Sequence, residues 1–129
     1  MVGQMKTIRQ KHHIPALPEE VFIALTNPFT IELWTGYPAE MSIVPGSEFS
    51  LFEGDIVGKN LQFKASELIK QQWYFEGEEK DSIVTLRLKP EKKNTIVELI
   101  HENVPDAVYE EMVSGWKKLY FGSLKRFFK

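Results

Sequence analysis

The feature that most constrains the fold is an aromatic segment of helical spacing at the C-terminal end of the sequence. Its apolar residues lie at positions 108, 109, 112, 113, 116, 119, 120, 124, 127 and 128, which form one broad stripe of a helix. Acidic residues lie in the first turns and basic residues in the last turn, as the helix dipole favours. A helix that starts at Pro105 would be roughly 36 Å long, enough to cross a whole sheet. The sequence therefore predicts a long helix that packs its aromatic face on a sheet.

Two glycines, Gly115 and Gly122, interrupt this segment. Each costs about 1 kcal/mol relative to alanine in a helix interior. Three interpretations remain open: close approach of another element, room for a ligand beneath the helix, or an exposed helix surface where a glycine is tolerated because little packing is lost.

From residue 40 to the start of this helix the apolar pattern has a period of two, which is typical of strands. Strands are expected at 5–14, 47–52, 56–63, 68–75, 82–89 and 95–103, joined by turns at 53–55, 76–81 and 90–94. The apolar parity slips between Ile56 and Leu61, so we expect a bulge near Gly58. Two short helices, 17–25 and 26–34, follow the first strand, and Asn27 is the expected cap of the second, with Pro28 at its first position. This order predicts an α+β domain with helices on one face of an antiparallel sheet.

Length and composition limit the kinds of fold and function that this chain can have. A chain of 129 residues suits a single domain, 1–129. The absence of cysteine excludes disulfides and thiolate metal sites and fits a cytoplasmic location. The first ten residues have no apolar core of signal-peptide length, so we expect no signal peptide, and no run reaches the roughly 20 apolar residues of a membrane span. A net charge of −2 gives no support for nucleic-acid binding.

Five collinear stretches carry a resemblance to a known family. They are "LPEEVFIALTNPFTIELWTGYPAEMS" (17–42), "GSEFSLFEGDIVG" (46–58), "IKQQW" (69–73), "HENVP" (101–105) and "GWKKLYFGSLKRFF" (115–128). Together they resemble the activator of heat shock protein 90 ATPase homologue family, of the START / birch-pollen-allergen superfamily. The resemblance implies a helix-grip fold: a bent antiparallel β-sheet wrapped around a long C-terminal helix, with two short helices after the first strand and often a cavity. Ala65 and Asn60 depart from the family pattern, where proline and an apolar residue are usual; Asn60 would make a cavity more polar or face solvent.

The same resemblance bears on partners. In eukaryotic co-chaperones of the family this domain is the C-terminal half of a larger protein, and a separate N-terminal domain makes the main chaperone contact. The present sequence resembles the short, stand-alone members. A chaperone or another protein is therefore the first candidate partner, with the chain as a monomer or weak homodimer.

The inward parity of the strands and the stripe of the last helix supply the candidate ligand-binding residues. These are Trp34, Phe49, Leu51, Trp73, Phe75, Val97, Leu99, His101, Met112, Trp116 and Tyr120. An apolar concavity with few polar groups is the usual small-molecule site. The same residues would also fill a core of ordinary density, and His101 is either a hydrogen-bonded core histidine or a polar anchor of the cavity.

The strand residues whose side chains are expected on the opposite, outward face of the sheet form a candidate protein-interaction surface. It comprises Leu68, Tyr74, Ile83, Ile96 and Ile100. A solvated sheet face is usually more polar than this, although strand propensity alone also places such residues there.

Motifs for catalysis are not expected. His12 and His13 are adjacent in a strand and point to opposite faces, so they cannot chelate one ion together. No nucleophile elbow or phosphate-binding loop is recognisable. We therefore expect no catalytic residues, no metal site and no cofactor. The leading hypothesis is a non-enzymatic, co-chaperone-like interaction module; the alternative is a carrier of a small hydrophobic ligand such as a lipid, sterol or polyketide-like compound.

Overall fold

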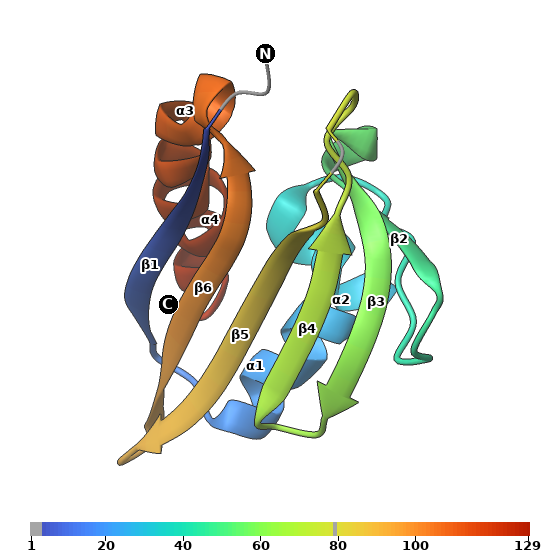
Figure 1. Ribbon diagram of the computed structural model, residues 1–129. Helices are drawn as coiled ribbons and strands as arrows, with labels where there is room; N and C mark the ends of the chain where they lie inside the picture. The colour runs from blue at the N-terminus through green and yellow to red at the C-terminus, as the bar shows by residue number, and fades with distance from the viewer. Residues whose placement is uncertain (1–3, 79) are drawn as a thin grey trace.

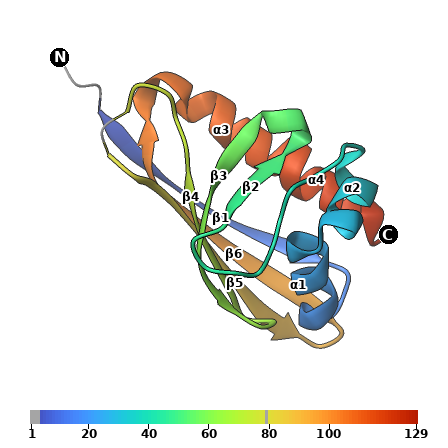
Figure 2. The same ribbon diagram turned by 90° about the vertical axis from the view of Figure 1, so that its right-hand side faces the viewer.

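Six strands form one antiparallel sheet, and the helices lie against one face of it (Figures 1 and 2). The computed structural model describes residues 4–78 and 80–129. Residues 1–3 of the opening segment and Glu79 of the expected 76–81 turn lie outside the described residues. The strands are β1 (Met5–Ile14), β2 (Glu48–Leu51), β3 (Ile56–Lys64), β4 (Leu68–Trp73), β5 (Ser82–Glu91) and β6 (Asn94–Pro105). The helical elements are α1 (Pro18–Thr26), α2 (Pro28–Thr35), η1 (Phe52–Gly54), η2 (Asp106–Val108), α3 (Tyr109–Gly115), the π turn η3 (Trp116–Tyr120) and α4 (Phe121–Phe127).

The strand order is β1-β6-β5-β4-β3-β2, so every neighbour pair except β1 and β6 is consecutive in sequence. The buried face of β5 and β6 carries Val84, Leu86, Leu88, Val97 and Leu99, each at most 3% exposed. Figure 2 shows the sheet curving around the C-terminal helix, with α1 and α2 at one end of it. The predicted helix-grip architecture is confirmed.

The two short helices are fixed by local signals. The Asn27 side-chain oxygen accepts hydrogen bonds from the backbone N–H groups of Phe29 and Thr30, at 2.9 and 3.1 Å, which confirms the predicted cap of α2. Gly36 ends α2 in the left-handed conformation, with φ of 86°. The Trp34 indole N–H donates to the Ala24 carbonyl at 2.7 Å and thereby joins α2 to α1.

The C-terminal helix differs from the expected uninterrupted α-helix. β6 runs through Pro105, which pairs with Met5, and a 3₁₀ turn precedes α3. At the π turn, the Phe121 N–H donates to the Trp116 carbonyl, five residues earlier. In an α-helix, five residues rotate a side chain roughly 140° from the starting residue; the wider turn keeps Phe121 on the face of Trp116. Phe121 is consequently fully buried, whereas Leu119, in the expected stripe, is 57% exposed.

The bulge predicted near Gly58 is present a short way further along β3. The register between β3 and β4 shifts between Asn60 and Gln62. Gly58 has a different role: a Cβ there would lie 2.0 Å from the Gln72 carbonyl oxygen and 2.9 Å from the Phe49 ring. The ring of Phe49 covers this glycine across the β2–β3 pair, so the position admits no side chain.

We expect Gly58→Ala to lower the free energy of unfolding by about 3 kcal/mol, since the strand must move away from the Gln72 carbonyl. Urea unfolding monitored by circular dichroism measures this. Gly115→Ala is the matched control: a Cβ there meets nothing within 4 Å, so the variant should gain about 0.5–1 kcal/mol. Equal stability of the Gly58 variant and the parent would contradict the close packing.

Candidate functional site

A pocket of about 620 Å³ lies between the C-terminal helix and the turn that joins β2 to β3. It is lined by Tyr37, Phe52, Glu53, Asp55, Ile56, Trp73, Glu111, Met112, Gly115, Trp116, Leu119 and Tyr120. Trp73 is the last residue of β4, and Trp116 begins the π turn, so the pocket is built where the sheet meets the irregular part of the helix.

The wall of the pocket is a group of aromatic rings in contact. Trp73 and Trp116 stack with ring centroids 4.6 Å apart and an interplanar angle of 23°. Tyr120 adds a ring 4.6 Å from Trp116 and contacts Trp34 edge-on at 5.2 Å. Stacking of this kind adds roughly 0.5–1.5 kcal/mol per pair beyond the area buried.

The indole N–H of Trp73 is held by a buried polar chain within the sheet. It donates to the Gln71 side-chain oxygen at 3.1 Å, and the Gln71 amide donates to Asn60 at 3.0 Å. The Asn60 amide nitrogen in turn donates to the Ser42 carbonyl and the Ser47 hydroxyl, both at 3.2 Å. Asn60 is fully buried, so it neither faces solvent nor lines the pocket; it ties the loop before β2 to the sheet.

The indole N–H of Trp116 is held by a second buried chain. It donates to Nδ1 of His101 at 3.0 Å, and Nε2 of His101 lies 2.8 Å from the Ser82 hydroxyl. Ser82 donates its own proton to the Glu102 carbonyl, which leaves the serine oxygen as acceptor and places the imidazole proton on Nε2. Burial lowers the pKa of His101 to about 3, so the ring stays neutral and both nitrogens are satisfied. His101 therefore positions Trp116 and does not line the pocket.

Tyr120 completes the aromatic wall and is 4% exposed. No buried side-chain nitrogen or oxygen among the described residues lacks a hydrogen-bond partner, so its hydroxyl is not a buried, unpaired group. Burial of the residue raises the pKa of Tyr120 well above its ordinary value, so the hydroxyl keeps its proton.

The opposite side of the pocket is a turn with unusual backbone geometry. Phe52, Glu53 and Gly54 are all left-handed, with φ values of 52°, 55° and 87°. For the two non-glycine residues this costs of order 1–3 kcal/mol each. The turn brings Glu53 and Asp55 to the pocket, and α3 brings Glu111.

Only part of the sequence-predicted ligand set lines this pocket. Trp73, Met112, Trp116 and Tyr120 do so. The remaining candidates pack in or against the core around it: Trp34, Phe49, Leu51, Phe75, Val97, Leu99 and His101. The ligand set predicted from the sequence does not contain Tyr37, Phe52, Glu53, Asp55, Ile56, Glu111 and Leu119. The first four lie in the segments that follow α2 and β2, Ile56 begins β3, and the last two lie on α3 and η3. Gly115, considered as room for a ligand, does line the pocket. At Gly122, by contrast, an added Cβ would lie 3.1 Å from the Lys117 carbonyl oxygen of the same helix.

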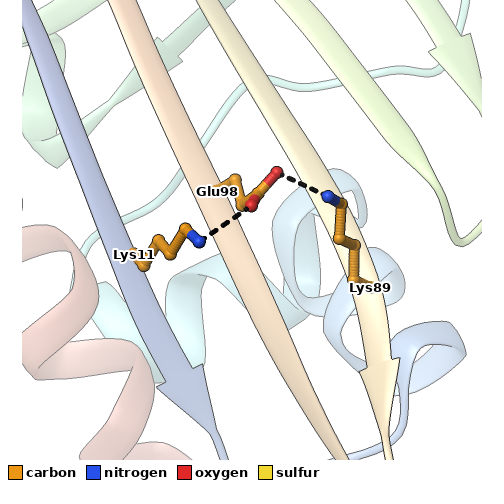
Figure 3. A network of polar contacts seen from close by, with 3 residues as sticks. All are labelled: Lys11, Lys89 and Glu98. Carbon is orange, nitrogen blue, oxygen red and sulfur yellow. Dashed lines mark ion pairs between the residues drawn. The ribbon is translucent and has the colours of Figure 1, made fainter.

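The predicted interaction residues on the outer sheet face are partly exposed and share this face with an ion-pair network. Leu68, Ile83, Ile96 and Ile100 are half-buried, and Tyr74 is 41% exposed. Between them Glu98 of β6 pairs with Lys89 at 3.0 Å and with Lys11 at 3.4 Å, across three strands (Figure 3). The hydrogen bond from Lys89, supported by Lys11, holds the pKa of Glu98 below its usual range.

Two further properties concern the described part of the chain. Among these residues, no group of three or more His, Cys, Asp or Glu side chains is placed to hold a metal ion. None of the described helices has the length and apolar character needed to cross a membrane.

Comparison with known proteins gives consistent results. Residues 15–129 match the family model described as Activator of Hsp90 ATPase homolog 1-like protein. The crystal structure of PFC0360w, an HSP90 activator from Plasmodium falciparum, is 25% identical with a TM-score of 0.86 and 96% of each chain covered. CalU16 from Micromonospora echinospora is 27% identical with a TM-score of 0.82, covering 97% of this chain and 77% of that one.

Two more relatives extend the comparison. The Aha1 dimer from Colwellia psychrerythraea shares the fold at 21% identity, with a TM-score of 0.83 and 96% of each chain covered. An uncharacterised protein of Schizosaccharomyces pombe, C1711.08, is 29% identical over 66 residues, or 51% of this chain. The matched stretch spans 20% of the length of that protein.

We expect the stability of the protein to fall as the pH drops from 6.5 towards 4. The unfolded chain takes up a proton at His101 near pH 6.5, whereas the folded chain does so only near pH 3, so acid favours unfolding. His12, whose pKa is lowered to about 4 by burial and by Lys125, acts in the same direction. His101→Gln should reduce the slope of unfolding free energy against pH by up to about 1.4 kcal/mol per pH unit.

Urea unfolding at pH 7, 6 and 5 measures this slope. The exposed His13 provides the control variant, His13→Gln. An unchanged slope in the His101 variant would show that the buried ring takes up its proton in the folded state as well.

Proposed function

The chain belongs to the Activator of Hsp90 ATPase homolog 1-like family, and from this premise and the geometry of its pocket we propose that it binds a small, largely apolar molecule beneath the C-terminal helix. The observation that carries the proposal is the aromatic wall of Trp73 and Trp116, whose N–H groups are already donated into buried chains. The two rings stack on each other, so they present apolar ring carbon to the pocket and not N–H donors. Apolar ring carbon packs well against apolar or aromatic ligands.

The size and support of the pocket favour this proposal. A volume of about 620 Å³ lies within the range of roughly 300–1,000 Å³ that small-molecule sites occupy. The walls resist collapse, because moving either indole inwards would leave a buried polar group unpaired, at a cost of roughly 1–3 kcal/mol. Gly115 lines the pocket from the helix and carries no side chain to fill it.

Binding of the neutral fluorescent probe N-phenyl-1-naphthylamine tests the proposal. We expect saturable quenching of tryptophan fluorescence with matching enhancement of probe emission. Gly115→Phe should weaken the affinity at least tenfold, about 1.4 kcal/mol, because the added ring occupies the pocket. Ser114→Phe is the matched control, since it adds the same ring at an exposed neighbouring position. Equal binding by both variants, with circular dichroism showing that both are folded, would refute the pocket as the site.

A second candidate function is contact with an HSP90-type chaperone. Two observations favour it: the 25% identity to a P. falciparum HSP90 activator over nearly the whole chain, and an apolar ridge on α2. Phe29 and Leu33, one helical turn apart, are 80% and 71% exposed. Such exposed apolar groups on one helix face suit a protein partner better than the charged outer sheet face does.

The ATPase rate of an HSP90-type chaperone, measured with and without the protein, tests this second function. We expect the rate to rise, and the double variant Phe29→Glu/Leu33→Glu to lose most of the increase. Tyr74→Glu on the outer sheet face is the control and should keep it. Loss of stimulation only with the Tyr74 variant would instead assign the contact to the sheet surface predicted from the sequence. Absence of any rate change would remove the chaperone as partner.

Both functions are binding functions of one domain spanning 1–129. A non-enzymatic role and a cytoplasmic location remain predictions from the sequence.

A further inference from the structure

The two short helices, which lie together at one end of the sheet (Figure 2), expose large apolar residues among acidic ones. We call this surface the α1–α2 face; it comprises Glu19, Glu20, Ile23, Phe29, Glu32 and Leu33. We infer that it binds an amphipathic helix of a partner protein that carries lysine or arginine beside its apolar residues. The inference deepens the second candidate function and rests on the same Phe29–Leu33 ridge.

The apolar part of the face is large and is not needed for the core. Phe29 and Leu33 of α2 are 80% and 71% exposed, and Ile23 of α1 is 53% exposed. Each helix packs its opposite side into the core, where Val21 and Ile31 are fully buried. Exposed apolar residues on the solvent side of two consecutive helices are typical of a protein-interaction surface.

The charges in this part of the chain have one sign. Residues 14–58 contain seven acidic residues and no lysine or arginine: Glu19, Glu20, Glu32, Glu40, Glu48, Glu53 and Asp55. Glu19 and Glu20 precede Ile23 by four and three residues, so one or two of these exposed carboxylates lie beside it on the helix surface. Glu32 follows Phe29 by three residues and lies beside it in the same way. Carboxylates therefore flank the apolar groups on both helices.

Basic side chains of the described residues do not neutralise this face. None of the ion pairs within residues 4–78 and 80–129 involves a residue of 14–58. The basic end of α4 lies beside β1 instead: Lys125 donates to Nδ1 of His12 at 3.3 Å, and it lines a second pocket together with Ile14, Arg126 and Lys129. The α1–α2 face thus keeps its negative charge, which attracts a basic partner.

The same charges disfavour other occupants of the face. An anionic lipid surface or a nucleic acid would be repelled by the carboxylates. A symmetric contact with the same face of a second copy would bring glutamates against glutamates. A basic amphipathic helix meets both requirements, because its apolar side covers the Phe29–Leu33 ridge while its lysine or arginine side chains reach the flanking carboxylates.

Binding of labelled model peptides, measured by fluorescence anisotropy, tests the inference. The probe is an amphipathic leucine–lysine helix. A leucine–glutamate helix of the same pattern keeps the apolar side and reverses the charge, and a serine–lysine peptide keeps the charge and lacks the apolar side. We expect the leucine–lysine peptide to bind about tenfold or more tightly than either control, since both the ridge and the carboxylates contribute.

The triple variant Glu19→Gln/Glu20→Gln/Glu32→Gln removes the charge of the face. We expect it to weaken binding of the leucine–lysine peptide by about tenfold or more. Glutamine keeps the shape of each side chain, and at position 20 it can still accept the hydrogen bond from the Leu17 N–H that caps α1.

A second triple variant, Glu53→Gln/Asp55→Asn/Glu111→Gln, is the matched control. It removes the same number of charges at the pocket between sheet and helix and should leave the peptide affinity within about twofold. Phe29→Ser/Leu33→Ser removes the ridge and should weaken binding about tenfold or more; these positions are so exposed that the fold should be retained, which circular dichroism checks.

The opposite results would overturn the inference. Equal losses in the two triple variants would show that the peptide responds to net charge alone. Unchanged binding by the ridge variant, or equal binding of the leucine–lysine and leucine–glutamate peptides, would remove the face as the site. Self-association that the Glu19/Glu20/Glu32 variant abolishes, measured by sedimentation velocity, would assign the face to a second copy instead.

The chaperone ATPase assay separates this inference from the second candidate function. Stimulation that the Glu19/Glu20/Glu32 variant retains in full would overturn the basic partner segment and leave the chaperone contact in place. Binding of the leucine–lysine peptide at the α1–α2 face, without any change in ATPase rate, would remove the chaperone as partner and support the inference.

Discussion

The stack of Trp73 on Trp116 is the interaction on which the rest of the candidate site depends. One ring comes from the end of a strand and the other from the helix, so their contact joins the sheet to the element it wraps. Each indole N–H then enters a different buried chain, one ending in the loop before β2 and the other at the β6 backbone. The two rings are therefore fixed in orientation as well as in position, and the polar atoms that fix them lie behind the wall.

Because of the π turn, the C-terminal helix both lines the pocket and packs a buried ring against β1. It keeps Trp116 and Tyr120 on the pocket while Phe121 is buried towards β1, where its ring stacks on His12 at 4.0 Å. A regular α-helix would rotate Phe121 away from Trp116. π turns in α-helices are frequent at functional sites, and here the extra residue separates the ring that builds the core from those that line the pocket.

The two candidate functions share one structural element. Tyr37 lines the pocket and is 43% exposed, and it follows α2, which carries the exposed ridge of Phe29 and Leu33. The proposed chaperone contact rests on family membership and on the likeness to the Plasmodium protein, whereas the proposed ligand binding rests on the geometry of the pocket. A single domain can carry both, because the ridge and the aromatic wall use different side chains.

The sequence alone determined the order of the elements, the cap at Asn27 and the inward parity of the strands, because these follow from local periodicity and from hydrogen bonds a few residues long. It also marked Trp73, Met112, Trp116 and Tyr120 as inward. Only the tertiary structure decided which inward residues border empty space: Val97 and Leu99 have the same parity as the pocket residues of neighbouring elements yet are covered on all sides. The positions of Glu53 and Asp55 at the pocket depend on three successive left-handed residues. The burial of Phe121 depends on an extra residue in one helical turn. Neither follows from residue type, because both conformations are locally unfavourable and persist only through the packing around them.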